Sequence, residues 1–300
     1  MRVGIPRALL YYYEKDMWKY FFEKLHVDII LSDKTTKKTI SDGEELAVDE
    51  ACLSLKIFLG HVKNLKGKCD AILIPRLFSI KSHEEVCTNF NALYDLIYNL
   101  FPDCKLINYN IDLRKGKNEV MAYTKVGSSL GFSYIDSFNA YCYAKRRVKE
   151  IKKERFLEQE KKLSSNKIKI LCSGHPYNLY DDMLGGEINK FLREHDVEII
   201  FSDLLDDSLV DDNAKVLSKE VHWTHNKKVM AACYYYGKSV DGIILISSFP
   251  CGPDSLTNEM IKRKMNIPIL NVQKESASST GLITRLEAFL DLLEVKQCSR

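Results

Sequence analysis

The sequence lacks any long apolar run. Neither its first residues, MRVGIPRALLYYY, nor any later stretch reaches the length of a signal-peptide core or of a helix that spans a bilayer. An excess of one charge is also missing, because 44 basic residues face 41 acidic ones, for a formal net charge of +3. Nucleic-acid binding depends on a basic surface that this balance does not supply. We therefore expect a cytoplasmic protein whose partners include neither a membrane nor a nucleic acid.

Three pairs of segments repeat along the chain at an almost constant offset. Residues 19–33 read KYFFEKLHVDIILSD and residues 189–203 read NKFLREHDVEIIFSD, 170 residues later. Asp70 opens DAILIPRLFS, and Asp241 opens DGIILISSFP. The third pair consists of KLINYN in the first half and PILNVQ in the second half. An internal duplication explains all three pairs.

Each half alternates short apolar strands with helical patterns, which predicts parallel sheets covered on both faces. We expect an α/β fold of two Rossmann-like parallel-sheet halves, related by internal duplication and joined by a helical linker. The predicted boundaries are 1–132 for the first half, 133–166 for the charged linker and 167–300 for the second half. No G-x-G-x-x-G follows the first strand of either half, so nucleotide binding is not favoured.

Nine cysteines in a chain expected in the cytosol predict roles in packing, catalysis or metal binding, since the cytosol keeps thiols reduced. Ligand sites in open parallel sheets form beyond the carboxyl ends of the strands. Cys87 and Cys251 follow equivalent strands of the two halves. Cys52 is expected just inside a helix whose first turn contains Asp49 and Glu50, where a thiolate is favoured. These three cysteines are the candidate ligands.

The other cysteines have more ordinary positions, and packing is the expected role of most of them. Cys69 and Cys104 precede strands, Cys142 and Cys233 fall in helical patterns, and Cys298 lies in a polar tail, whereas a role for Cys172, at the end of IKILC, stays open. The three candidates are separated by 35 and 164 residues, which matches no local metal motif. On the residues alone, a shared metal site and three separate structural thiols both remain open.

Five segments carry a family resemblance that runs from the first residues to about Leu293. They read GIPRALLYYY, DEACLSLKIFLGHV, GHPYNLYDD, CGPDSLTNEM and TRLEAFLDLL. Together they resemble the 2-hydroxyacyl-CoA dehydratase-related proteins, and most of all a small branch related to a domain of unknown function that is also found fused to acyl-CoA dehydratase activators.

The resemblance implies that Cys52, Cys87 and Cys251 hold one [4Fe–4S] cluster, or a related iron–sulfur cluster, between the two halves. It also implies an ATP-dependent activator protein as the electron donor, a small-molecule or acyl-CoA substrate, and an anaerobic metabolic setting. Dehydratase subunits are longer and work in two-subunit complexes, so homo- or hetero-oligomers are expected here. The sequence departs from the family at NVQKESASSTG, where an acidic pair and a histidine or threonine are expected.

Two residues on the predicted strand-end loops, His175 and Arg7, are the candidate catalytic groups, with Tyr177 and Asp254 nearby. Each also has an ordinary role open to it, such as a helix start, a surface position or a bond to a backbone carbonyl. Two functions remain: a cluster-dependent lyase (dehydratase) or reductase, and an electron-transfer or cluster-carrying partner with no substrate pocket of its own. The sequence does not separate them.

Overall fold

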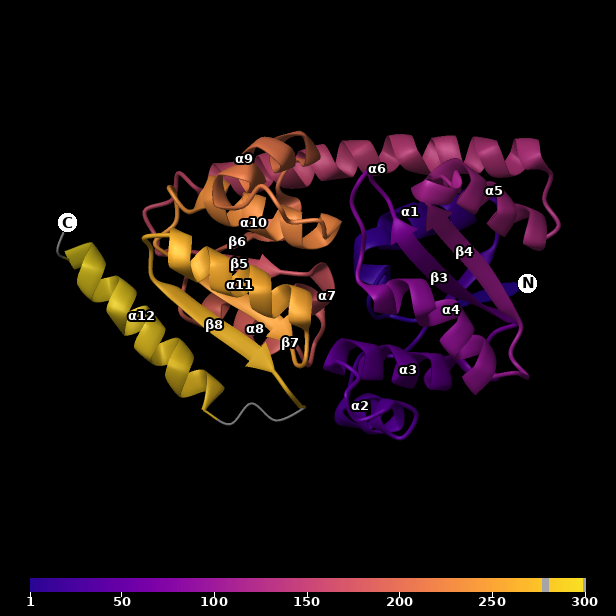
Figure 1. The fold of residues 1–300 in the computed structure, drawn as a ribbon, viewed down its shortest axis with the longest axis horizontal. Helices are drawn as coiled ribbons and strands as arrows, with labels where there is room; N and C mark the ends of the chain where they lie inside the picture. The colour runs from indigo at the N-terminus through magenta and orange to yellow at the C-terminus, as the bar shows by residue number, and fades with distance from the viewer. Residues whose placement is uncertain (277–280, 299–300) are drawn as a thin grey trace. The chain divides into compact units, whose positions relative to one another are not determined.

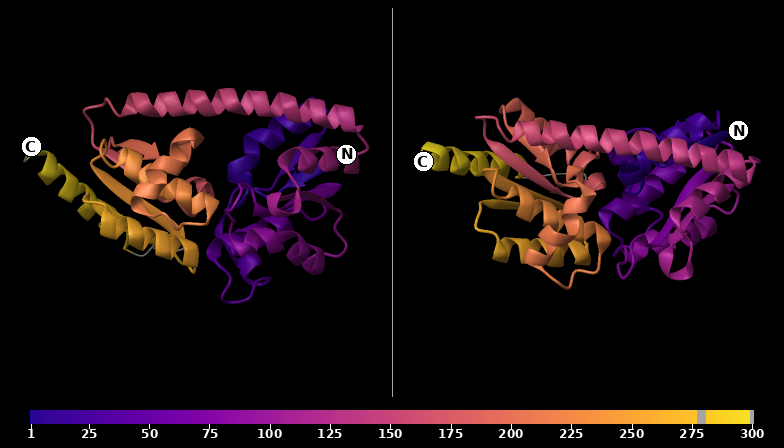
Figure 2. Two further views of the ribbon diagram at one scale, coloured as in Figure 1. Left: turned by 45° about the horizontal axis from the view of Figure 1, so that its top comes forward. Right: turned by 90° about the horizontal axis from the view of Figure 1, so that it is seen from above.

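The computed structural model describes residues 1–276 and 281–298. Its contacts divide the chain into two compact units. The first contains residues 1–151 and the short segment 222–224, and the second contains residues 152–221 and 225–300. One helix, α6 (Tyr134–Lys162), begins in the first unit and ends in the second, and Figure 2 shows it as one uninterrupted helix. This helix covers most of the segment that the sequence predicts as a linker.

The first unit alternates strands and helices, as Figure 1 shows. Its elements are β1 (Arg2–Ile5), α1 (Tyr11–Lys24), β2 (Asp28–Leu31), α2 (Lys37–Glu44), α3 (Leu53–Leu65), β3 (Ala71–Ser79), α4 (Thr88–Leu100), β4 (Leu106–Asp112) and α5 (Glu119–Ser129). Between β4 and α5 lies one short 3₁₀ turn, Leu113–Lys115.

The second unit has the same alternation. Its elements are β5 (Lys169–Gly174), α7 (Pro176–Tyr180), α8 (Gly186–Glu194), β6 (Glu198–Phe201), α9 (Val210–Leu217), α10 (Thr224–Tyr236), β7 (Gly242–Ser248), α11 (Gly252–Lys264), β8 (Ile269–Lys274) and α12 (Leu282–Cys298). Two 3₁₀ turns, Ser202–Leu204 and Asp207–Leu209, lie between β6 and α9.

The two sheets have the same topology. The strand order is β2-β1-β3-β4 in the first unit and β6-β5-β7-β8 in the second, and every pairing is parallel. The registers also correspond, since Arg2 pairs with Asp28 and Lys169 pairs with Glu198. The strands β5 and β7 are almost wholly buried, as expected for parallel strands that helices cover on both faces. The predicted α/β fold with two Rossmann-like halves is confirmed.

An aspartate holds the start of the first strand in each sheet. The Asp70 carboxylate accepts a hydrogen bond from the backbone N–H of Arg2 at 2.7 Å. In the second sheet the Asp241 carboxylate accepts one from the backbone N–H of Lys169 at 2.9 Å. Since Asp70 and Asp241 open the repeated segments of the sequence, this shared contact gives a physical reason for the repeat.

A serine after the second strand of each sheet makes another shared contact. Ser32 Oγ accepts a hydrogen bond from the backbone N–H of Arg7 at 2.7 Å, and Ser202 Oγ accepts one from that of Gly174 at 3.2 Å. Both serines are buried. The polar side chain therefore satisfies a backbone donor just where the neighbouring strand ends. These two pairs of contacts indicate that the duplication extends to the details of the strand ends.

Helices α2 and α3 of the first unit pack unusually closely, through Gly43 and Gly60. A Cβ atom on Gly60 would lie 1.9 Å from the carbonyl oxygen of Thr39, and one on Gly43 would lie 1.7 Å from that of Lys56. Only residues without a side chain permit this approach. The contact bears on the position of Cys52, because α3 begins directly after this residue.

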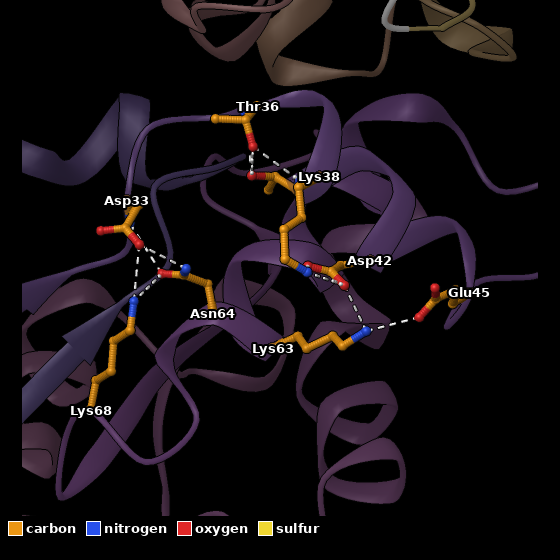
Figure 3. A network of polar contacts seen from close by, with 9 residues as sticks. Asp33, Thr36, Lys38, Asp42, Glu45, Lys63, Asn64 and Lys68 are labelled. Carbon is orange, nitrogen blue, oxygen red and sulfur yellow. Dashed lines mark hydrogen bonds and ion pairs between the residues drawn. The ribbon is translucent and has the colours of Figure 1, made fainter.

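Polar contacts hold the other end of α3, as Figure 3 shows. Lys63 Nζ lies 2.7 Å from Asp42 on α2, and Asn64 and Lys68 both donate to Asp33 beyond β2, at 2.9 Å. The Lys68–Asp33 pair is exposed and the Lys63–Asp42 pair is partly exposed, so each pair contributes only a few tenths of a kcal/mol up to ~1 kcal/mol. Burial of the apolar face of α3 and the glycine contact with α2 dominate its placement.

The described residues contain no helix that combines the length and the apolar content needed to cross a membrane.

Candidate functional site

Cys52 and Cys87, both in the first unit, occupy the N-cap positions of α3 and α4. Each is half-buried. The helix dipole and the amides of the first turn favour negative charge at such a position, which is the charge of a metal-binding thiolate. The side-chain amide of Asn89, in the first turn of α4, donates to Cys52 Sγ at 3.8 Å. This contact brings the two N-caps close to each other.

The expected start of α3 needs a correction. The sequence predicted that Asp49 and Glu50 form the first helical turn, with Cys52 inside the helix. The helix instead begins at Leu53, and both acidic residues lie in the turn that precedes Cys52. An extended ψ of 149° at Cys52 ends the turn and lets its carbonyl accept the first helical hydrogen bonds.

The strand boundaries also differ from the expected ones. β3 continues through the segment RLFS to Ser79, which was expected to be loop, and β5 continues past Cys172 to Gly174. As a result His175, and not Cys172, directly follows the end of β5. Cys172 is fully buried in the core, and burial raises the pKa of its thiol to about 12. Cys172, the cysteine whose role was left open, is therefore a core residue.

Arg7 lies on the loop after β1, as predicted. Its Nε donates to the carbonyl oxygen of Ser32 at 3.2 Å, and its backbone N–H is bound by the same serine. These contacts fix the guanidinium at the carboxyl edge of the first sheet. Burial, together with the positive charge of Arg7, lowers the pKa of His61 to about 4, so the imidazole of His61 is neutral at pH 7. His61 contacts Thr35 Oγ1 at 2.9 Å.

In the second unit, Cys251 is the N-cap of α11, and Pro253 and Asp254 lie in the first turn of that helix. Proline fits there because its missing N–H would have no helical partner. Cys251 is half-buried, whereas only 5% of Asp254 is exposed. The Cys251 thiol is one of the groups that lower the pKa of the Asp254 carboxyl. The helix start therefore presents a thiol and a carboxylate together at the carboxyl edge of the sheet.

His175 and Asp254 form a buried pair at the same edge. His175 Nε2 lies 2.9 Å from Asp254 Oδ1, and Asn226 Nδ2 donates to the same oxygen at 2.8 Å. Burial on its own would raise the pKa of Asp254, but the charge of His175 and hydrogen bonds from His175, Asn226 and Cys251 outweigh it. The net pKa of Asp254 therefore lies below its usual range, and the group is a carboxylate at neutral pH.

Two aromatic rings pack against His175. The ring of Tyr177 stacks on it with centroids 5.0 Å apart, and the ring of His225 meets it edge-on at 5.9 Å. Burial, helped by the charges of His175 and Lys228, lowers the pKa of His225 to about 3, so His225 is neutral. His175 thus has a carboxylate on one side and two rings packed around it, an arrangement that fixes the orientation of the imidazole.

Thiols at helix N-caps and a carboxylate-bound imidazole have distinct chemical capacities. The first suit a soft metal or a metal cluster, and the second suits proton transfer at a bound molecule. Within residues 1–276 and 281–298, no group of three or more His, Cys, Asp or Glu side chains lies close enough together to hold a metal ion. The chemistry of the donors fits a thiolate-bound cluster, because the three candidate cysteines are half-buried and stand at N-caps.

The remaining cysteines mostly follow the expectations. Cys69 and Cys104 precede β3 and β4, and Cys142 is exposed on α6. Cys233 is buried in α10, where burial raises the pKa of its thiol to about 12. Cys298 is the last residue of α12, so the predicted tail is helical up to that point. Of the segment NVQKESASSTG, residues 277–280 lie outside the described residues.

Sequence reasoning missed Asn89, Asn226 and His225. Asn226 and His225 stand at the start of α10, far along the chain from any strand end, so the strand-end rule could not find them. Asn89 lies only two residues after Cys87, but no spacing rule connects an asparagine there with Cys52. The sequence did place His175, Tyr177 and Asp254 on loops that meet.

Two other features carry no catalytic chemistry. A cavity of about 460 Å³ opens at the amino edge of the second sheet, among Lys169, Lys238 and Lys296. Helices end near this edge, so the lysines are suited to neutralising the partial negative charge of the helix C-termini.

The sequence G-S-S-L-G at 127–131 matches a nucleophile-elbow pattern, but it spans the end of α5, and Ser129 Oγ donates to the Val126 carbonyl.

The fold and the site define a class: a parallel α/β protein of two related units, with thiols and a buried imidazole–carboxylate pair at its strand ends. The family model described as "CoA enzyme activase uncharacterised domain (DUF2229)" matches residues 2–205. The chain therefore belongs to this family, as the resemblance read from the sequence predicted. No curated protein matches the chain.

Solved structures give weaker likenesses. The Ni²⁺ complex of the SBP FpvC from P. aeruginosa has 12% identity over 100% of this chain and 98% of its own, with a TM-score of 0.29. ZnuA has 9% identity over 98% of each chain and a TM-score of 0.27. A Cd-bound periplasmic metal binding protein from candidatus liberibacter asiaticus has 9% identity over 98% and 99%, with a TM-score of 0.30. At these scores the likenesses carry no argument about function.

Proposed function

We propose that this protein binds one [4Fe–4S]-type cluster through Cys52, Cys87 and Cys251, and that it catalyses a cluster-dependent dehydration or reduction. The observation that carries the proposal is the shared position of these cysteines. Of the eight cysteines with described side chains, these three, and no others, are helix N-caps. Each helix start favours the thiolate that a cluster requires.

The proposal needs Cys251 of the second unit to join the two cysteines of the first. Three protein ligands leave one iron open, which when the cluster is bound supplies Lewis-acid and one-electron chemistry to a substrate oxygen. The electron would come from an ATP-dependent activator protein, in keeping with the activase description of the family. The substrate would be an acyl-CoA or another small molecule.

His175 has the role of a proton donor or acceptor. Its Nε2 is bound to the Asp254 carboxylate, which fixes the orientation of the ring. Asn226 holds that carboxylate in place from the start of α10. An acid–base group of this kind, located next to Cys251, suits the loss or gain of a hydroxyl group. An electron carrier has no need of it.

Arg7 would bind negative charge on the substrate. Its guanidinium has five N–H donors, one of which is used on the Ser32 carbonyl. The rigid attachment to Ser32 keeps the side chain at the strand end, so the remaining donors face a defined direction.

The test is anaerobic reconstitution with iron and sulfide, followed by iron and sulfide analysis and electron paramagnetic resonance. Cys52→Ser, Cys87→Ser and Cys251→Ser should each lose most of the cluster. Cys142→Ser, which changes an exposed thiol on α6, is the matched control and should load like the wild type. Equal loading of all four variants would refute the three-cysteine site.

A second measurement separates the enzyme from an electron carrier without a substrate pocket. The wild type and His175→Ala are assayed with reduced activator and a panel of acyl-CoA thioesters under anaerobic conditions. Turnover by the wild type, lost in His175→Ala with the cluster retained, supports catalysis. Reduction of the cluster by the activator with no turnover of any thioester would favour the carrier.

A further inference from the structure

Asn89 connects the two cysteine-bearing helix starts of the first unit. It lies in the first turn of α4, two residues after the N-cap Cys87, and its side-chain amide points to the N-cap of α3. The Nδ2 to Cys52 Sγ distance is 3.8 Å, between residues 37 positions apart in the sequence. A single side chain therefore links both sulfur-bearing caps, although neither the strand-end rule nor the cysteine spacing points to it.

The donor reaches the sulfur from a different helix. The first amides of α3 bond to the carbonyl oxygen of Cys52, with Leu55 N at 2.9 Å and Lys56 N at 3.1 Å. The Cys52 side chain does not cap the amides of the first turn of α3. The amide of Asn89 thus brings to the sulfur a donor from a different helix, α4.

We infer that Asn89 is a positioning residue that holds the Cys52 sulfur beside α4 and makes the bound cluster easier to reduce. The inference rests on the cluster site proposed above. Hydrogen bonds to cluster sulfurs are one of the factors that set the reduction potential, because they stabilise the more negative, reduced state. A donor at Cys52 therefore raises the potential, and its loss lowers the potential.

Two substitutions at this position predict an order of potentials. Asn89→Ala removes the donor, and Asn89→Asp replaces it with a carboxylate of the same shape beside a thiolate. The potential should fall from wild type to Asn89→Ala and further to Asn89→Asp. For Asn89→Ala the expected change is about threefold in the ratio of reduced to oxidised cluster, which is about 28 mV for one electron at 59 mV per tenfold change.

The experiment is an anaerobic redox titration of the reconstituted full-length protein, followed by electron paramagnetic resonance. Asn99→Ala is the matched control, since Asn99 lies near the end of the same helix, is exposed and donates to the Asp95 carbonyl. Its potential should equal that of the wild type. Thermal unfolding of each variant checks that α4 is intact.

The outcomes are distinct. The predicted order, or loss of the cluster from Asn89→Ala while Asn99→Ala stays loaded, supports the role of Asn89. Equal potentials in both Asn89 variants, Asn99→Ala and the wild type overturn that role and leave the cluster site standing. Failure of the wild type to take up any cluster overturns both proposals.

Discussion

Replacement of Gly60 by alanine tests the close packing of α2 against α3. A Cβ atom on Gly60 would lie 1.9 Å from the carbonyl oxygen of Thr39. Real Cβ atoms essentially never lie closer than 3.0 Å to another heavy atom. The clash is with backbone, which cannot rotate away as a flexible side chain can. The two helices would therefore have to separate by about 1 Å, the difference between these distances, and their shared contacts would be lost.

The magnitude follows from two opposing effects. Alanine is better than glycine in a helix interior by ~1 kcal/mol. Overpacking costs ~1–3 kcal/mol, and a backbone clash belongs at the upper end. We expect Gly60→Ala to lower the free energy of unfolding by about 2 kcal/mol. Gly67 has φ of +78° with open space around its Cβ position, so Gly67→Ala should cost about 1 kcal/mol through backbone strain alone.

Urea unfolding followed by circular dichroism measures both changes. Because Cys52 caps α3, Gly60→Ala should also increase the rate at which an alkylating reagent modifies Cys52, and Gly67→Ala should not. A Gly60→Ala protein that is as stable as the wild type, or more stable by the ~1 kcal/mol of helix propensity, would refute the close packing.

Two further predictions concern pH and thiol reactivity. The pKa values of His61 and His225 are lowered to about 4 and about 3, so the native state excludes protons that the unfolded chain binds below its ordinary value of about 6.5. Stability should be full above pH 6.5 and fall as the pH drops, by up to ~1.4 kcal/mol per pH unit for each histidine; a urea midpoint unchanged between pH 7.5 and pH 5 would contradict this. Cys172 and Cys233 are buried, with pKa values raised to about 12, whereas Cys142 is exposed. Mass spectrometry after brief alkylation should find Cys142 modified in the native protein and the other two modified only after denaturation, and native modification of either buried thiol would count against the core assignment.

The fold could be predicted because its signals are local and repeated. Apolar runs such as AILIP and GIILIS, each bounded by polar or helical segments, identify parallel strands without knowledge of their neighbours. The repeat added the order of the elements, and Asp70 and Asp241 show why it is recognisable. Each aspartate binds the backbone N–H at the start of the strand beside it, so the same residue is needed at the same place in both units.

The exact ends of the helices and strands could not be predicted from the sequence. Whether a strand stops at Cys172 or at Gly174 depends on how far β7 and Ser202 offer partners to its backbone groups. Those partners come from elements about 30 and 70 residues further along the chain. For the same reason the sequence could not show that Cys52 caps α3 rather than lying inside it.

The sequence by itself determined the fold class, the duplication, the family and a short set of polar candidate residues. Periodicity and repeated motifs can be recognised from the order of the residues alone. Only the tertiary structure decided which candidates meet. It joined His175 to Asp254, added Asn226 and His225 from α10, and linked Asn89 to Cys52. Such contacts are hydrogen bonds and a ring contact of a few ångströms between helices and loops far apart in the chain, and chain folding alone sets those distances.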